Sequence, residues 1–211
     1  GNTNPELAAY TNNYYDISCF YESANDVIGD YFDFIPEKDN KLIFVIGDIS
    51  GKGLPAALYM VRAQAIIHSL LNHFDDLRNV VNNLKTYFCE NLQPGFFLTL
   101  PAAKIDQKGE LKFFRAGHTP ALLYQYAENK FYDISPKGMG IGLNANGMFS
   151  DILEEKTLHT SSGDIVMFYT DGITDTQNPD MQQFGMAPVK EIIRAHSEKS
   201  SEEIKDKLME K

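Results

Sequence analysis

The hydrophobic positions of the chain form two blocks of strand-like pattern, one before and one after a helical stretch. In the first block, aromatic and β-branched residues gather over 14–22, 27–35 and 41–47, and the turn formers of 36–40 separate the last two segments. From residue 55 to residue 72 the apolar residues recur at helical spacing. The N-terminal part is therefore predicted to form three strands followed by a long helix.

The rest of the chain adds a second helix, returns to strand pattern and ends in helical pattern. Ser200 and Ser201, which are favoured N-cap residues, precede the last helix. Because the strands come in blocks and do not alternate strictly with helices, we expect an α+β fold of antiparallel sheets with helices packed outside them. The predicted elements are a helix over 77–91, strands over 96–105, 110–115, 121–126, 148–158 and 164–169, and helices over 187–196 and 202–209.

Length and composition fit one large domain. The chain has 211 residues, 43% of them hydrophobic, so we expect a single domain over 1–211 with 1–12 as an N-terminal lead-in. We see no run of about 18 apolar residues and no signal-peptide pattern at the start, so no membrane segment and a cytoplasmic location are expected. Cys19 and Cys89 are too few for a disulfide framework and are expected to be reduced core residues.

The charge of the chain limits its partners. The formal net charge of −10 disfavours nucleic acid, because the phosphates of nucleic acid need a basic protein surface. An acidic chain is compatible with a cation site built from carboxylates.

Three aspartates, Asp30, Asp48 and Asp171, stand where apolar strands end and glycine loops begin. If their carboxylates converge, they offer the oxygen-only ligands that suit Mg²⁺ or Mn²⁺. Such an ion polarises a phosphoryl oxygen and lowers the pKa of bound water, which makes the water a nucleophile. The alternative is that each aspartate caps a turn, the commoner role of Asp beside Gly.

Other motifs give weaker signals. The segment 47–53 is not a phosphate-binding P-loop, since Gly53 stands where a Ser or Thr must reach Mg²⁺. Lys52 in this segment is either a solvent-facing side chain or a phosphate contact. The five histidines are scattered, which argues against a zinc site. Among them His118, in Gly-His-Thr-Pro, suits a turn held by hydrogen bonds of the imidazole.

Taken in order, several segments resemble the motifs of the SpoIIE-type (RsbU-like) metal-dependent serine/threonine protein phosphatases of the PPM family. The most specific match is VIGDISGKGLPAAL at 45–58. The others are DVIGDYFDF at 26–34, RAGHTP at 115–120, GMGIGL at 138–143 followed by GD at 163–164, and FYTDGITD at 168–175.

The resemblance implies a four-layer α-β-β-α sandwich of two antiparallel sheets flanked by helices. It also implies hydrolysis of phosphoserine or phosphothreonine by metal-activated water at a two-ion Mn²⁺ or Mg²⁺ site. Asp48 would be the central ligand, joined by the Ile49 carbonyl, and Asp171 would hold the second ion. Asp30 would bind the metal or its waters, or would lie in the outer shell.

Further expectations of the resemblance concern the substrate and the partners. Gly51, Lys52 and His118 are candidates for substrate contact or for the outer shell of the metal. The substrate would be a phosphoprotein, an anti-sigma-factor antagonist, and an upstream sensor, regulatory domain or partner would act on the enzyme through the helix over 55–72. A homodimer is possible. The alternatives are a pseudophosphatase that only binds its partner, and a small-molecule phosphohydrolase.

Two departures from the family pattern stand out. Ile28 occupies the place of a glycine before Asp30, which reduces the freedom of the backbone there. The family also closes with an Asp-Asp-x-Thr strand that supplies another ligand, and the pair Asp75 and Asp76 does not fit that motif. We therefore expect the C-terminal strand to be missing from this chain, and one carboxylate of the metal site with it.

Overall fold

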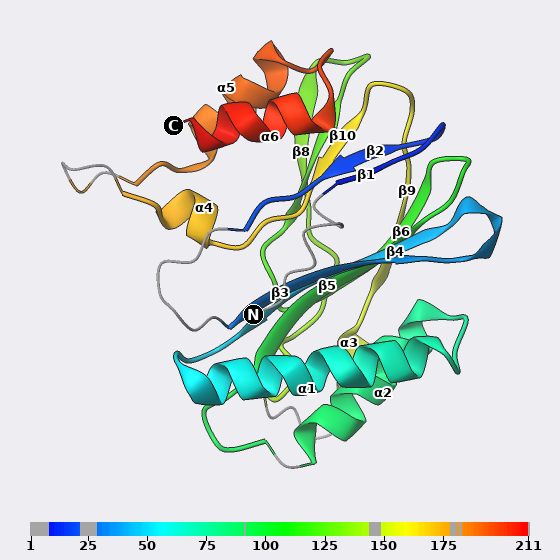
Figure 1. Ribbon diagram of the computed structural model, residues 1–211, viewed down its shortest axis with the longest axis vertical. Helices are drawn as coiled ribbons and strands as arrows, with labels where there is room; N and C mark the ends of the chain where they lie inside the picture. Colours follow the sequence, from blue (N-terminus) through cyan, green and yellow to red (C-terminus); the bar gives the residue numbers. More distant parts are fainter. Residues whose placement is uncertain are drawn as a thin grey trace.

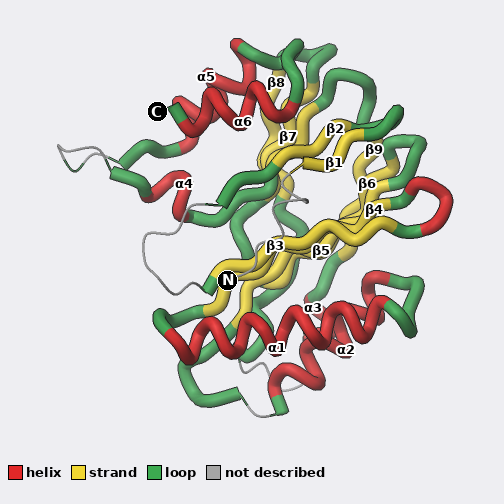
Figure 2. The backbone as a smooth tube through the Cα atoms, viewed as in Figure 1, coloured by secondary structure: helices red, strands yellow, loops and turns green. Residues whose placement is uncertain are grey.

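A computed structural model describes residues 9–21, 29–90, 92–143, 149–177, 181 and 183–210. Its main strands form a five-stranded and a three-stranded antiparallel sheet that lie face to face, with helices covering the outer face of each (Figure 1). The tube view shows the same order of layers, with yellow strands between red helices (Figure 2). The predicted α+β sandwich of four layers is confirmed.

The larger sheet has five strands in the order β3-β4-β5-β6-β9. Along β4, the side chains of Ile43, Val45 and Ile49 pack in the helix-covered core, whereas Phe44 packs in the core shared with the other sheet. One face of this sheet therefore meets helices and the opposite face meets the second sheet. The strands are β3 (Asp30–Pro36), β4 (Leu42–Ile49), β5 (Leu98–Ile105), β6 (Glu110–Ala116) and β9 (Glu155–His159).

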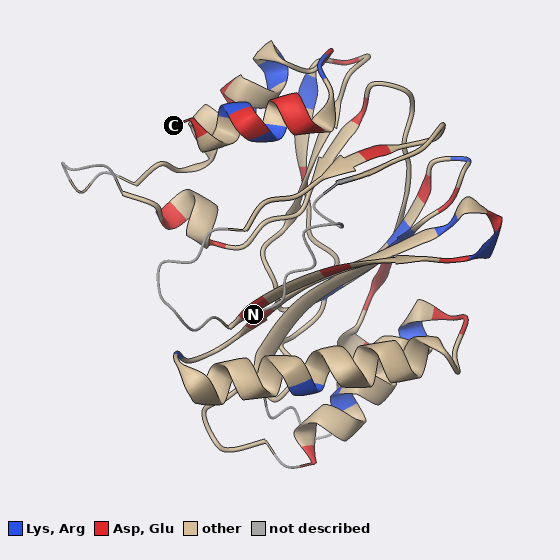
Figure 3. Ribbon diagram, in the orientation of Figure 1, with Lys and Arg blue, Asp and Glu red and all other residues tan. Residues whose placement is uncertain are grey.

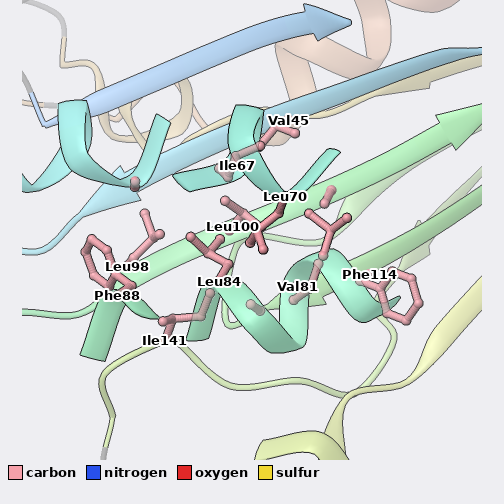
Figure 4. Packing of buried hydrophobic residues seen from close by; sticks show 14 of the residues in the cluster. Val45, Ile67, Leu70, Val81, Leu84, Phe88, Leu98, Leu100, Phe114 and Ile141 are labelled. Atoms are coloured by element: carbon pink, nitrogen blue, oxygen red, sulfur yellow. The ribbon is translucent and has the colours of Figure 1, made fainter. Parts of the chain in front are cut away.

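Two helices, α1 (Leu54–Leu71) and α2 (Leu77–Cys89), cover this larger sheet. Their apolar stripes recur at helical spacing and interdigitate with the sheet side chains, as the close-up in Figure 4 shows. Burial of one such large apolar side chain contributes roughly 1.5–3 kcal/mol. The residues labelled there are Val45, Ile67, Leu70, Val81, Leu84, Phe88, Leu98, Leu100, Phe114 and Ile141.

The smaller sheet has the order β10-β7-β8, and its outer face packs on the two C-terminal helices. Ser200 caps the last helix and forms a capping box with Glu203, so the predicted N-cap is confirmed at Ser200. The elements are β7 (Ala121–Gln125), β8 (Lys130–Ile134), β10 (Ile165–Met167), α5 (Met186–Ala195) and α6 (Ser201–Met209).

A short hairpin near the N-terminus pairs β1 (Ala9–Thr11) with β2 (Asp16–Ser18) and lies beside α6. The Asp16 carboxylate accepts a hydrogen bond from the Ser201 amide at 2.7 Å, which ties the hairpin to the start of that helix. The expected lead-in over 1–12 thus contains a strand. The predicted strand over 14–22 is shortened to three residues, and residue 22 lies outside the described residues.

Several other expectations need correction. The strand predicted over 148–158 is wrong over 149–152, where Phe149 anchors the short helix α3 (Phe149–Ile152) in the core before β9 begins, and residue 148 lies outside the described residues. The sequence did not indicate β8, an edge strand whose side chains are mostly exposed, nor α4 (Gly172–Asp175) and the 3-10 turn η2 (Lys38–Asn40), which are too short for a periodic signal. Residues 27 and 28 of the predicted second strand lie outside the described residues.

Within the described part of the chain, one helix has the length and composition to cross a membrane, and it is α1, with a mean hydropathy of 1.3 over 18 residues. The helix is not an unbroken apolar run, since Arg62, Gln64 and His68 lie within it. The buried positions of α1 pack on the sheet, as in a core helix. Cys19 and Cys89 are both half-buried, and Cys89 packs against the core.

Candidate metal centre

Three residues form a row across neighbouring strands at one end of the larger sheet. Asp30 of β3 lies directly opposite Asp48 of β4, and Asp48 lies opposite Thr99 of β5. Directly opposite residues of antiparallel strands have their side chains on the same face. Asp48 and Phe44 are an even number of residues apart on β4, so their side chains lie on the same face of the sheet. This row therefore faces the second sheet.

The carboxyl groups of Asp30 and Asp48 are close enough to share a hydrogen bond. Burial raises the pKa of Asp48 to about 7, and the charges of Asp30 and Asp171 add to the shift. Burial likewise raises the pKa of Asp30, against the lowering effect of its hydrogen bond with Asp48. Two adjacent half-buried carboxylates repel each other, so a cation or a shared proton must accompany them.

Asp171 approaches this pair from the other sheet. It follows β10 and stands at the N-cap of α4, yet its side chain makes no capping hydrogen bond. Asp30 and Asp48 lie within strands, so the three carboxylates are not used to cap turns in the way the alternative reading expects. In Figure 1 the starts of β3 and α1 lie at the same end of the sandwich as α4.

Among the described residues, no group of three or more His, Cys, Asp or Glu side chains is close enough to hold one metal ion. The structure thus brings Asp30 and Asp48 into contact and places Asp171 within electrostatic reach of both. The donor set fits a hard divalent cation, because it offers oxygens alone and the charges that act on the pair are those of carboxylates. The residues fit the ion that the sequence indicated, with two carboxylates close together and the third further away.

The backbone before Asp30 runs against the residue after Asp48. The Ile49 amide donates to the Gly29 carbonyl at 3.2 Å. A Cβ atom placed on Gly29 would lie 2.8 Å from Ile49 Cγ2 and 3.1 Å from the Ile49 carbonyl oxygen. Glycine at position 29 therefore leaves the Ile49 carbonyl uncrowded.

The loop between β4 and α1 is fixed by Ser50. The Ser50 hydroxyl donates to the Gly95 carbonyl at 3.1 Å and accepts from the Phe97 amide at 2.8 Å. Gly51 takes a φ of +99°, a conformation that favours glycine. Lys52 follows on the exposed tip of the loop, beside an α1 N-terminus that has no side-chain cap.

His118 is buried, with 5% of its surface exposed. Its Nε2 lies 3.0 Å from the Tyr169 carbonyl, which only accepts, so Nε2 carries the proton and Nδ1 accepts from the Thr99 hydroxyl at 2.8 Å. Burial lowers the pKa of His118 to about 4. The Thr119 hydroxyl also donates to the Tyr169 carbonyl, and Arg115 donates to the His118 carbonyl. The imidazole of His118 is thus hydrogen-bonded, but to Thr99 and to the Tyr169 carbonyl, 19 and 51 residues away in sequence, and not within its own turn.

One further residue near the carboxylates, Tyr21, was not indicated by any sequence pattern. The Tyr21 hydroxyl is buried and has no hydrogen-bond partner among the described residues. Burial raises the pKa of Tyr21 to about 12, and the charges of Asp30 and Asp48 contribute to the rise. A tyrosine in an aromatic segment has no local signal that separates it from a core residue. Ser50 and Thr99 were missed for the same reason, since their roles depend on partners far along the chain.

The chain resembles known proteins in sequence and in fold. It is 29% identical to the phosphoserine phosphatase RsbU of Bacillus subtilis over 176 residues, which cover 80% of this chain and 51% of RsbU. It is 26% identical to the protein IcfG of Synechocystis over 214 residues, which cover 86% of this chain and 32% of IcfG. The chain thus spans about half or less of the length of these relatives.

The solved structures share the architecture. The SiaA-PP2C domain of Pseudomonas aeruginosa superposes with a TM-score of 0.72 at 16% identity, covering 87% of this chain and 72% of that one. The structure of the PP2C phosphatase domain and a fragment of the regulatory domain of SpoIIE from Bacillus subtilis gives a TM-score of 0.66 at 21% identity, covering 88% of this chain and 53% of that one. The fold described above is therefore PP2C-like. The family model for stage II sporulation protein E (SpoIIE) matches residues 38–211, and the chain belongs to this family.

Proposed function

We propose that this chain is the catalytic part of a metal-dependent protein phosphatase that hydrolyses phosphoserine or phosphothreonine on a regulatory protein. The observation that carries the proposal is the half-buried pair of Asp30 and Asp48, with Asp171 facing it from the second sheet. Membership of the SpoIIE family and the similarity to RsbU support the reaction type. A phosphorylated anti-sigma-factor antagonist in the cytoplasm is the substrate that this reading favours.

Each residue has a definite part in this proposal. Asp48 and the Ile49 carbonyl would hold one ion, Asp171 would hold the second, and Asp30 would bind an ion directly or through water. When bound, Mn²⁺ or Mg²⁺ supplies a water of lowered pKa and polarises the phosphoryl oxygen. Asp30 and Asp48 lie on strands and Asp171 at the start of α4, so the carboxylates would need little reorganisation during the reaction.

The loop that follows Asp48 supplies the substrate contact in this proposal. The free amides at the N-terminus of α1 and the exposed ammonium of Lys52 both favour a phosphate dianion. Gly51 lets the loop turn close to the carboxylates, and Ser50 holds it there. Lys52 thus serves to attract the phosphate group, while the aspartates serve the chemistry.

A phosphatase assay with Mn²⁺ tests the proposal on a small phosphoester and on a phosphoserine protein. Asp48→Asn and Asp171→Asn should each lower kcat/KM more than about 100-fold, since even outer partners of metal ligands cost 10–100-fold. Asp151→Asn, at an exposed position on α3, is the matched control and should keep the wild-type rate.

Two outcomes would favour the alternatives. A wild-type protein that is inert with both Mn²⁺ and Mg²⁺, yet binds its phosphoprotein, would be a pseudophosphatase. A strong preference for phosphorylated metabolites over phosphoproteins would indicate a small-molecule phosphohydrolase.

The regulatory part of the proposal concerns the outer face of α1. Leu54, Leu58 and Val61 follow one another at helical spacing and are 64%, 61% and 63% exposed. Arg62 is the one Lys, Arg, Asp or Glu of this helix, and Figure 3 shows its ribbon almost entirely uncharged. An apolar face of this kind suits a docking surface. We assign it to a regulatory region of the full-length protein, and a second copy of the chain is the competing occupant.

A further inference from the structure

The ligands of the proposed metal centre come from two different sheets. Asp48 lies within β4 of the larger sheet, and Asp171 follows β10 of the smaller one. Apolar side chains lie between the two sheets, among them Phe44 and Phe168, whose ring centroids lie 4.9 Å apart. Apolar contacts are not directional, so they fix the separation of the sheets less sharply than hydrogen bonds do.

A polar connection crosses between the sheets at the metal centre. Thr99 of β5 lies opposite Asp48, and its hydroxyl is 2.8 Å from His118 Nδ1. The other ring nitrogen of His118 is 3.0 Å from the carbonyl of Tyr169, two residues before Asp171. His118 is the one polar or charged residue among the described residues that is buried. These hydrogen bonds therefore connect Thr99, which lies opposite Asp48, to the segment that carries Asp171.

We propose that His118 and Thr99 form a clamp that sets the spacing between Asp48 and Asp171, and so act as positioning residues for the metal centre. The inference rests on the proposed function, because it takes these aspartates as ligands. It goes beyond that function by assigning His118 and Thr99 no contact with substrate or ion. Their part is to hold the two sheet edges at one separation.

The surroundings of His118 support a rigid clamp. Gly117 has a φ of +72°, and a Cβ atom placed on it would lie 2.4 Å from the Gly140 amide nitrogen, so the turn is tightly packed. Arg115 donates to the His118 carbonyl and, through Nε, to the Pro136 carbonyl at 3.0 Å. On the far side, the Thr174 amide and hydroxyl both donate to the Asp171 carbonyl at 2.9 Å. Both ends of the clamp are thus anchored in ordered backbone.

Binding of Mn²⁺ alone, measured by calorimetry on the whole chain, tests the clamp without relying on catalysis. Thr99→Val removes the hydroxyl at constant shape, and His118→Gln removes the ring acceptor while leaving a donor. Thr99→Ser restores the hydroxyl. Thr160→Val is the matched control, because the Thr160 hydroxyl donates to the Gly109 carbonyl at 3.0 Å at the opposite end of the sheet.

We expect Thr99→Val and His118→Gln to weaken Mn²⁺ binding about tenfold or more, as for other outer partners of metal ligands. Thr99→Ser should bind nearly as the wild type does. Thr160→Val should lower the free energy of unfolding and leave the Mn²⁺ affinity unchanged. Amide exchange over 169–174 should be faster in Thr99→Val than in Thr160→Val, which gives a second readout.

Two results overturn the clamp, and they are distinguishable. If Thr99→Val and His118→Gln bind Mn²⁺ as tightly as the wild type while Asp48→Asn does not, the metal centre stands and the hydrogen bonds merely stabilise the fold. If the wild type and Asp48→Asn show the same Mn²⁺ binding or none, the proposed metal centre fails and the clamp fails with it.

Discussion

At the scale of single residues, the candidate site combines buried polar groups that differ in their hydrogen bonding. Asp30 and Asp48 share a hydrogen bond, and His118 is buried neutral with both ring nitrogens bonded. The Tyr21 hydroxyl is buried beside the carboxylates without a partner among the described residues. A buried hydroxyl without a hydrogen bond lowers the free energy of unfolding by roughly 1–3 kcal/mol, because nothing replaces the hydration it has lost.

Tyr21→Phe should therefore raise the free energy of unfolding of the metal-free protein by about 1 kcal/mol, because it removes an unpaired buried hydroxyl. Tyr31→Phe is the matched comparison, since the Tyr31 hydroxyl donates to Asp33 at 2.7 Å, and it should lower that free energy by roughly 1–3 kcal/mol. Urea denaturation measures both. A loss of stability in Tyr21→Phe would mean that the hydroxyl has a bonded partner in solution.

At the scale of elements, α1 joins the site to the outside of the molecule. Its N-terminus follows the loop that comes after Asp48 and β4, its inner face packs on the sheet, and its outer face is exposed and apolar. Near its other end, His68 Nε2 lies 2.5 Å from the Asp33 carboxylate of β3. The helix therefore contacts the strands that carry both Asp30 and Asp48.

Leu58→Glu should abolish binding of the regulatory region, added as a separate polypeptide, because a charge in the middle of the apolar face is costly to bury. Gln64→Glu introduces the same charge at an exposed polar position of α1 and should bind normally. Sedimentation velocity measures the complex. Self-association of the chain that Leu58→Glu abolishes would assign the face to a second copy, and binding unaffected by Leu58→Glu would exclude this face.

At the scale of the whole molecule, stability depends on buried titrating groups whose effects on pH dependence oppose each other. The pKa of His118 lies near 4 in the fold and near 6.5 when unfolded, so its contribution is complete above pH 6.5 and is lost as the pH falls toward 4. The pKa of Asp48 is raised to about 7 from 3.8, so its contribution is complete below 3.8 and is lost as the pH rises through 7.

The difference between the wild type and His118→Gln isolates the histidine from these opposing effects. Between pH 7.5 and pH 4, the stability of the wild type should fall relative to His118→Gln by about 3 kcal/mol, because folding lowers the pKa of His118 from 6.5 to about 4. Denaturation of both metal-free proteins across this range measures it. A constant difference would mean that His118 titrates normally in the fold.

Sequence pattern alone was enough for most of the elements and for three of the candidate ligands. The core helices and most strands of the larger sheet follow from apolar spacing, because one face of each element must be buried. Asp30, Asp48 and Asp171 could be named because a carboxylate beside glycine at a strand end is a local signal. The exposed edge strand β8 and the four-residue helix α4 carry too little pattern to be found this way.

Tertiary structure alone decided which residues meet. Thr99 lies opposite Asp48 although the two are 51 positions apart in sequence. His118 bonds to the Tyr169 carbonyl, which is also 51 positions away in sequence. Strand register and the packing of one sheet on another are long-range properties, so local spacing does not encode them in readable form. The sequence thus determined which carboxylates are available, and the fold decided that two of them touch, that the third approaches from the other sheet, and that a buried histidine spans the gap.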